Sequence, residues 1–108
     1  MVDINIYNFE EEVLGCKSEV FVIFSASRCS YCRDLKRLVQ ILQRVLTDVK
    51  FCCVDVDAEK NLAAKFSVTR LPTSVVFFEG EVKARAEGAL TKAEVYALLQ
   101  RNPKNEKD

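Results

Sequence analysis

Two cysteines, Cys29 and Cys32, stand three positions apart between an apolar run and a long amphipathic stretch. The apolar run, 20–24, is typical of a buried strand, and the stretch 33–47 is typical of a helix. A C-x-x-C pair at a strand-to-helix junction puts the first sulfur beside unpaired helix N–H groups, which stabilise a thiolate. The second sulfur lies about one helical turn further on, near enough to form a disulfide with the first. The segment therefore predicts a redox-active dithiol.

The composition predicts one domain with a single core. The chain has 108 residues, and 49% of them are apolar, as in a globular protein. Sixteen basic residues balance sixteen acidic ones, so no nucleic-acid partner is expected. No apolar run is long enough to cross a bilayer, so no membrane partner is expected either. Histidine is absent, which excludes His-dependent catalysis and His-containing metal sites.

The cysteine count favours a reducing compartment. Five cysteines are an odd number, so they cannot all pair within one chain. Residues 1–5 lack the basic and apolar regions of a secretory signal, and we expect a cytoplasmic location. The simplest interpretation of Cys16, Cys52 and Cys53 is that they are small buried apolar residues, with Cys16 the most exposed of the three.

The periodic segments predict an α/β fold in the order β-α-β-α-β-α-β-β-α, with a central mixed five-stranded sheet flanked by four helices. Asn8 and Thr91 each precede a glutamate by three positions, as in a capping box, and should open helices. A domain at 1–103 should be followed by a flexible tail at 104–108. We expect strands at 4–7, 19–25, 49–56, 73–78 and 82–87, a turn at 79–81, and helices at 8–14, 33–47, 59–66 and 91–102.

Nearly the whole chain resembles the thioredoxin family, and three segments carry the resemblance. Residues 24–32 stand where the family has a strand followed by W-C-G-P-C, and 68–73 resemble its cis-proline segment. Residues 79–82 and 88–91 are similar to its hairpin and last loop. The resemblance implies the thioredoxin fold and a thiol–disulfide oxidoreductase that reduces protein disulfides without a bound cofactor. It implies a thioredoxin reductase or another dithiol donor as partner, and we expect a monomer.

The resemblance also implies roles for single residues. Cys29 is the expected attacking thiolate and Cys32 the expected resolving thiol, joined by a redox disulfide when oxidised. Pro72 is expected to be cis, with the Leu71 backbone facing an extended substrate and Gly88 leaving room on the groove rim. We expect no metal at this site. The other residues predicted to line the substrate groove are Arg28, Ser30, Tyr31 and Arg70.

Three of these groove residues allow two interpretations each. Arg28 and Arg70 either lower the pKa of Cys29 and attract acidic partners or are ordinary solvated charges, and the second interpretation is favoured for Arg70. Tyr31 either contacts the substrate, which is favoured, or is an aromatic residue exposed by the start of the helix.

The dipeptide between the cysteines departs from the family, and it keeps other functions open. Ser30-Tyr31 replaces Gly-Pro and is closer to the dipeptide of glutaredoxins, so a glutathione-linked oxidoreductase is one alternative. An iron–sulfur cluster shared by two subunits with glutathione is another, and a non-catalytic peptide-binding module is a third. Metal binding with Cys52 and Cys53 is disfavoured because neighbouring strand residues point to opposite faces.

A second departure concerns the proton of the resolving cysteine. Ile23 stands where the family has a buried aspartate, and Cys53 stands where it has the accompanying lysine. Losing both leaves no uncompensated buried charge. It also removes the usual acceptor for the Cys32 proton, so we expect water or a substrate group to take that proton.

Overall fold

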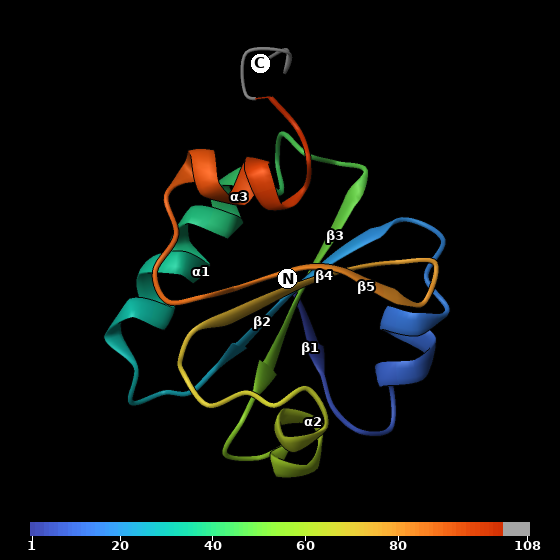
Figure 1. Ribbon diagram of the computed structural model, residues 1–108, viewed down its shortest axis with the longest axis vertical. Coiled ribbons are helices and arrows are strands. Elements are labelled where there is room, and N and C mark those ends of the chain that lie inside the picture. Colours follow the sequence, from blue (N-terminus) through green and yellow to red (C-terminus); the bar gives the residue numbers. More distant parts are fainter. Residues whose placement is uncertain (103–108) are drawn as a thin grey trace.

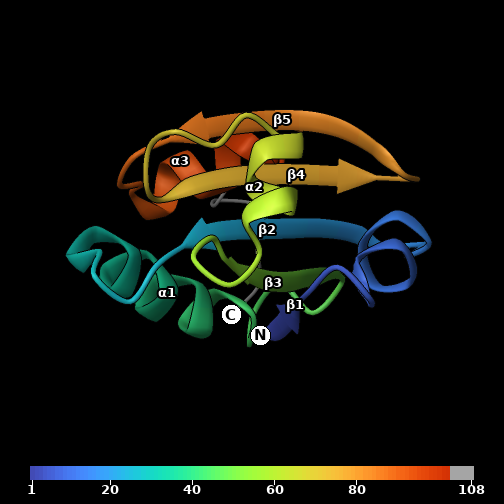
Figure 2. The same ribbon diagram turned by 90° about the horizontal axis from the view of Figure 1, so that it is seen from below.

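The computed structural model describes residues 1–102 and confirms the predicted α/β architecture. Helices α1 and α3 cover one face of the sheet, and η1 and α2 cover the other (Figures 1 and 2). The predicted tail, 104–108, lies outside the described residues. The elements are β1 (Val2–Ile4), η1 (Glu10–Leu14), β2 (Glu19–Ser25), α1 (Ser30–Leu42), β3 (Val49–Asp55), α2 (Lys60–Lys65), β4 (Thr73–Phe78), β5 (Glu81–Glu87) and α3 (Lys92–Leu98).

The sheet places β2 at its centre, in the order β1-β3-β2-β4-β5. Strand β3 pairs in parallel with both β1 and β2, whereas β4 pairs antiparallel with β2 and β5. Side chains 20–24 of β2 are fully buried, as a strand covered on both faces requires. The carboxyl end of β2 leads directly into the start of α1, which puts the C-x-x-C pair at the edge of the sheet. None of the helices within residues 1–102 is long and apolar enough to cross a bilayer.

Helix α1 is shorter than the predicted 33–47. It begins at Ser30 because Cys29 caps it, and it ends at Leu42. The chain then turns, with the N–H of Leu46 donating to the carbonyl of Leu42 and the N–H of Val49 donating to that of Leu46. Leu46 is buried, so this turn keeps an apolar side chain in the core while the chain reverses toward β3. Apolar spacing alone could not separate that turn from more helix.

At the start of the chain, a strand followed by a short helix ending at Leu14 was predicted correctly, but the bounds of the strand and the cap of the helix were wrong. A strand was expected at 4–7, but β1 ends at Ile4, and the Asn5 side-chain carbonyl accepts from the N–H groups of Tyr7 and Asn8. Asn8 was expected to cap a helix, but its side-chain carbonyl accepts from the Asn5 N–H at 2.8 Å instead. Local side chain–backbone bonds of this kind compete with strand pairing and fold the segment into a turn. The short π-helical segment η1 follows.

The second half of the chain follows the prediction more closely. Thr91 and Glu94 form the predicted capping box at the start of α3. The hairpin turn consists of Glu79 and Gly80, whose φ angles of 52° and 80° are both positive, so β5 begins one residue earlier than predicted. Helix α3 ends at Leu98, short of the predicted end at 102, and α2 is one residue shorter at each end than predicted. Strand β3 also ends one residue early.

Candidate active site

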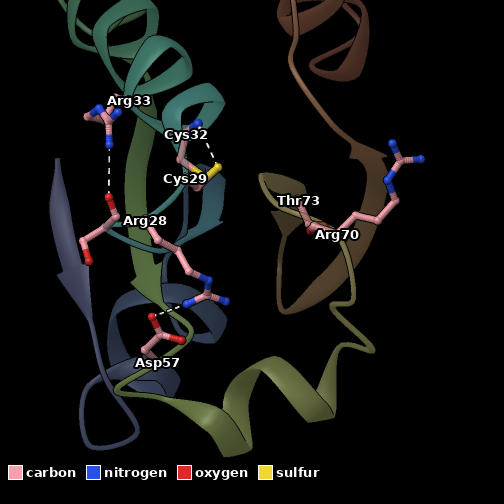
Figure 3. Close-up of a disulfide and its surroundings, with 8 residues drawn as sticks. Arg28, Cys29, Cys32, Arg33, Asp57, Arg70 and Thr73 are labelled. Carbon is pink, nitrogen blue, oxygen red and sulfur yellow. Dashed lines mark hydrogen bonds and ion pairs between the residues drawn. A yellow bond between two sulfur atoms is a disulfide. The ribbon is translucent and has the colours of Figure 1, made fainter.

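The two cysteines of the C-x-x-C pair form a disulfide at the start of α1, with their Cα atoms 5.3 Å apart (Figure 3). Cys29 is the N-cap residue, in an extended conformation with φ −99° and ψ 111°. Its Sγ accepts from the N–H of Cys32 at 3.1 Å. The first sulfur therefore lies where unpaired helix N–H groups and the positive end of the helix dipole favour a thiolate after reduction.

The two sulfurs differ in access. Cys29 is partly exposed, whereas Cys32, in the first turn of α1, is only 1% exposed. A protein-sized substrate can therefore reach Cys29 but not Cys32. This difference matches the order of attack expected for a C-x-x-C dithiol, with the first cysteine meeting the substrate and the second acting from below.

The segment before β4 faces the disulfide and is fixed by hydrogen bonds. The Leu71–Pro72 peptide bond is cis, and Pro72 is buried. Thr73 Oγ1 donates to the Arg70 carbonyl on one side of the proline, and the Gly88 N–H donates to the Pro72 carbonyl at 2.7 Å on the other. Strand β4, the cis bond and the loop after β5 are thereby held together in one wall.

A groove of about 450 Å³ lies along this wall. It brings together four residues predicted for the substrate groove, one from the start of α1 and three from the facing segments. Tyr31 is 62% exposed at its edge, and no atom lies within 4 Å of where a Cβ on Gly88 would stand. Ser30 is exposed and does not line the groove. The lining residues are Tyr31, Arg70, Leu71, Gly88 and Ala89, of which Ala89 was not predicted.

Arg28 lies outside the groove. Its guanidinium forms an ion pair with Asp57, in the segment after β3, and Figure 3 shows it extending toward Asp57 with Arg70 on the opposite side of the disulfide. Nearby, Arg33 donates to the Ser27 carbonyl at 3.0 Å and fixes the approach to the disulfide. Sequence reasoning missed Asp57 because an exposed acid 29 residues away carries no local sign of a partner.

An apolar residue occupies the position where the family resemblance implies a buried aspartate. Ile23 is fully buried and pairs in register with Cys53 on β3. Cys53 is not the buried residue that was expected: it is partly exposed, and its Sγ–H donates to Asp3 Oδ1 at 3.0 Å. Partial burial, with the Asp3 carboxylate, raises the pKa of Cys53 to about 11. This thiol is therefore a poor proton acceptor at neutral pH.

The other two free cysteines are also poor candidates for the site. Cys52 is fully buried on the η1 and α2 side of the sheet, as predicted, and burial raises its pKa to about 12. Cys16 is partly exposed near Ser18, 3.2 Å away. Within residues 1–102, no group of three or more Cys, Asp or Glu side chains is arranged to hold a metal ion.

An accessible N-cap cysteine, disulfide-bonded to a buried one and facing a cis-proline wall, defines a thiol–disulfide oxidoreductase.

The sequence profile of the family Thioredoxin matches residues 1–101. The chain is 30% identical to thioredoxin from Pseudomonas aeruginosa, over 94% of this chain and 95% of that one. It is 35% identical to thioredoxin from Mycoplasma genitalium, over 82% and 87%. The X-ray structure of Fasciola hepatica thioredoxin superposes with a TM-score of 0.81 at 27% identity, covering 94% of this chain and 100% of that one. The chain belongs to the thioredoxin family.

Proposed function

We propose that Cys29 is the nucleophile and Cys32 the resolving cysteine of a protein-disulfide reductase. The Cys29 thiolate attacks one sulfur of a substrate disulfide, and the other substrate sulfur leaves as a thiolate that takes a proton. Cys32, after giving up its proton, attacks Cys29 in the mixed disulfide and releases the second substrate thiolate. Two electrons pass to the substrate, and the protein keeps the Cys29–Cys32 disulfide. The single observation that carries this assignment is the contrast between an accessible Cys29 and a buried Cys32.

The wall opposite the disulfide is proposed to hold the substrate. Leu71 offers the backbone groups of an extended segment, and Gly88 leaves open space on the rim. An extended substrate strand would pair with this backbone while its disulfide meets Cys29. Disulfide-containing proteins are the substrates that membership of the family implies.

The remaining parts of the proposal concern the cell. A thioredoxin reductase, or another dithiol donor, would return the disulfide to the dithiol. The three free thiols among residues 1–102, Cys16, Cys52 and Cys53, support a reducing compartment, and we place the protein in the cytoplasm. We propose that it acts as a monomer, since each step needs only the two cysteines of one chain.

The test is dithiothreitol-driven reduction of insulin disulfides by the native chain, Cys29→Ser and Cys32→Ser. Both variants should lose turnover, and Cys32→Ser should accumulate a mixed disulfide with the substrate. Cys16→Ser is the matched control, because it removes a thiol outside the site and should keep native turnover. Turnover in Cys29→Ser would contradict the proposed roles, and native turnover only with a glutathione mixed disulfide would point to the glutathione-linked alternative.

A further inference from the structure

The groove beside the disulfide contains one charged residue, Arg70, among its lining side chains. The other lining residues are Tyr31, Leu71, Gly88 and Ala89, so no acid from residues 1–102 lines the groove. In Figure 3 the Arg70 side chain leaves the segment before the cis bond and extends away from the disulfide beside the end of β5. Its guanidinium therefore points away from Cys29 in this structure.

The charge of Arg70 is not neutralised by its neighbours. No ion pair or side-chain hydrogen bond of its guanidinium occurs within the described part of the chain, 1–102. Glu87, next to the groove residue Gly88, has its Oε2 3.8 Å from a guanidinium nitrogen of Arg85. Of the other arginines near the disulfide, Arg28 is paired with Asp57, and Arg33 donates to the Ser27 carbonyl. Among the residues that line the groove, Arg70 is thus the one cation, and within residues 1–102 its charge is available to a substrate.

The base of the Arg70 side chain is fixed although its tip is free. Thr73 Oγ1 donates to the Arg70 carbonyl, and the Gly88 N–H donates to the Pro72 carbonyl, so the backbone on both sides of the groove is held. The exposed guanidinium can then turn toward a ligand without moving the wall. A guanidinium presents paired N–H donors that match the two oxygens of a carboxylate.

We propose that this groove selects disulfide substrates with an aspartate or glutamate beside the reacting cysteine, and that Arg70 binds that carboxylate. The inference rests on the proposed function, because it names a substrate class for the same site. The chain as a whole has no net charge, so general electrostatic attraction does not provide this preference. Arg70 acts on substrate choice, while Cys29 and Cys32 carry out the exchange.

Three disulfide peptides test this proposal. They differ only at the residues that flank the cysteine, which are Glu, Gln or Lys. At an ionic strength of about 0.02 M, we expect kcat/KM for the Glu peptide to be about fivefold higher than for the Lys peptide. Arg70→Gln should remove the preference, and Arg70→Glu should reverse it. Raising the ionic strength to about 0.5 M should bring the native ratio close to one.

Arg44→Glu is the matched control, since it makes the same change in charge at an exposed position beyond the end of α1. It should keep the native preference. If the ratio of kcat/KM for the Glu peptide to that for the Lys peptide is unchanged in Arg70→Glu, the inference is wrong. Turnover of all three peptides would in that case still support the proposed function. Absence of turnover with every peptide and with insulin would overturn the proposed function, and the inference with it.

Discussion

Ser74 on β4 lies directly opposite Ile23 on β2, and its buried hydroxyl has no hydrogen-bond partner within residues 1–102. On the other side of Ile23, Cys53 pairs with it from β3. The three side chains form one row across the sheet, centred where the family has its buried aspartate. The row contains the Ser74 hydroxyl as a donor and no carboxylate that could accept from it. This replacement bears on both the stability of the protein and its proton transfer.

Restoring the carboxylate should change the pH dependence of catalysis. In Ile23→Asp, burial would raise the pKa of the new carboxyl, and the Ser74 hydroxyl could donate to its oxygens. We expect the rate of insulin reduction to gain a pH dependence that the native chain lacks, and stability to fall by about 3 kcal/mol because a polar group is buried. Rates measured from pH 5 to 9 check this.

Ile23→Asn is the matched control for that experiment, because it has similar size and polarity but does not titrate. It should be destabilised without the new pH dependence. Identical pH profiles in the native chain, Ile23→Asp and Ile23→Asn would mean that an acid at this position plays no part in proton transfer from Cys32.

The unpaired hydroxyl of Ser74 predicts a stabilising substitution. A buried donor without a partner costs free energy, and Ser74 is 0% exposed. Ser74→Ala should raise the free energy of unfolding by about 1 kcal/mol, measured by urea denaturation. Thr73→Ala is the contrasting variant, since its hydroxyl donates to the Arg70 carbonyl, and it should be destabilised. A loss of stability in Ser74→Ala would show that the hydroxyl is satisfied in solution.

Features set by short-range chemistry were predictable from the sequence. The alternation of segments gave the order of the elements, and Thr91 with Glu94 marked the start of α3 through two reciprocal hydrogen bonds. The same rule failed at Asn8, because Asn5 offered a competing side-chain acceptor only three residues before it. Asn8 and Thr91 are both polar and both precede a glutamate by three positions, so the capping-box pattern alone could not distinguish them.

The full set of site residues could not be predicted from short-range sequence patterns alone. The spacing of Cys29 and Cys32 predicted the dithiol, but the expected roles of Leu71, Pro72 and Gly88 came from the family resemblance. Contacts such as Arg28 with Asp57 join exposed side chains from distant segments, and no local pattern records them. Whether an arginine near the disulfide is paired or free therefore depends on the fold.

The Arg28–Asp57 pair predicts that Arg28 has little influence on the reactivity of Cys29, the proposed nucleophile. The two side chains are 63% and 52% exposed, and Asp57 offsets the charge of Arg28. Alkylation of Cys29 by iodoacetamide at pH 7, in Cys32→Ser protein, should change little in Arg28→Gln. Asp57→Asn, which frees the arginine, should accelerate it about twofold. A tenfold slowing in Arg28→Gln would show instead that the paired arginine still activates Cys29.

The dipeptide between the cysteines predicts a reduction potential less negative than about −270 mV, the value for thioredoxin. Tyr31 keeps a backbone N–H in the first turn of α1, where proline has none. An additional unpaired N–H in the turn that Cys29 caps favours the Cys29 thiolate and therefore the reduced form. Replacing Ser30 and Tyr31 together by Gly and Pro should lower the potential by about 30 mV in equilibration against a dithiol buffer.

The control for the potential keeps the backbone donors. A variant with Ala at both Ser30 and Tyr31 has the same N–H groups and should keep nearly the native potential. A native value at or below about −270 mV would contradict the prediction. A shift in the Ala variant as large as in the Gly-Pro variant would assign the effect to the side chains.

The burial of the Cys52 thiol predicts that the protein loses stability in alkaline solution. Burial raises the pKa of this thiol to about 12, whereas an unfolded cysteine has a pKa of about 8.5. Above pH 9 the unfolded chain releases this proton and the folded chain keeps it, so stability falls as the pH rises toward the folded pKa. Between pH 8.5 and 10.5 the oxidised protein should lose about 2 kcal/mol through this thiol, as measured by urea unfolding. In Cys52→Ala, the free energy of unfolding should decline less steeply with pH, although the smaller side chain leaves a less filled core. A decline as steep as that of the native chain would mean that Cys52 ionises equally in the folded and unfolded states.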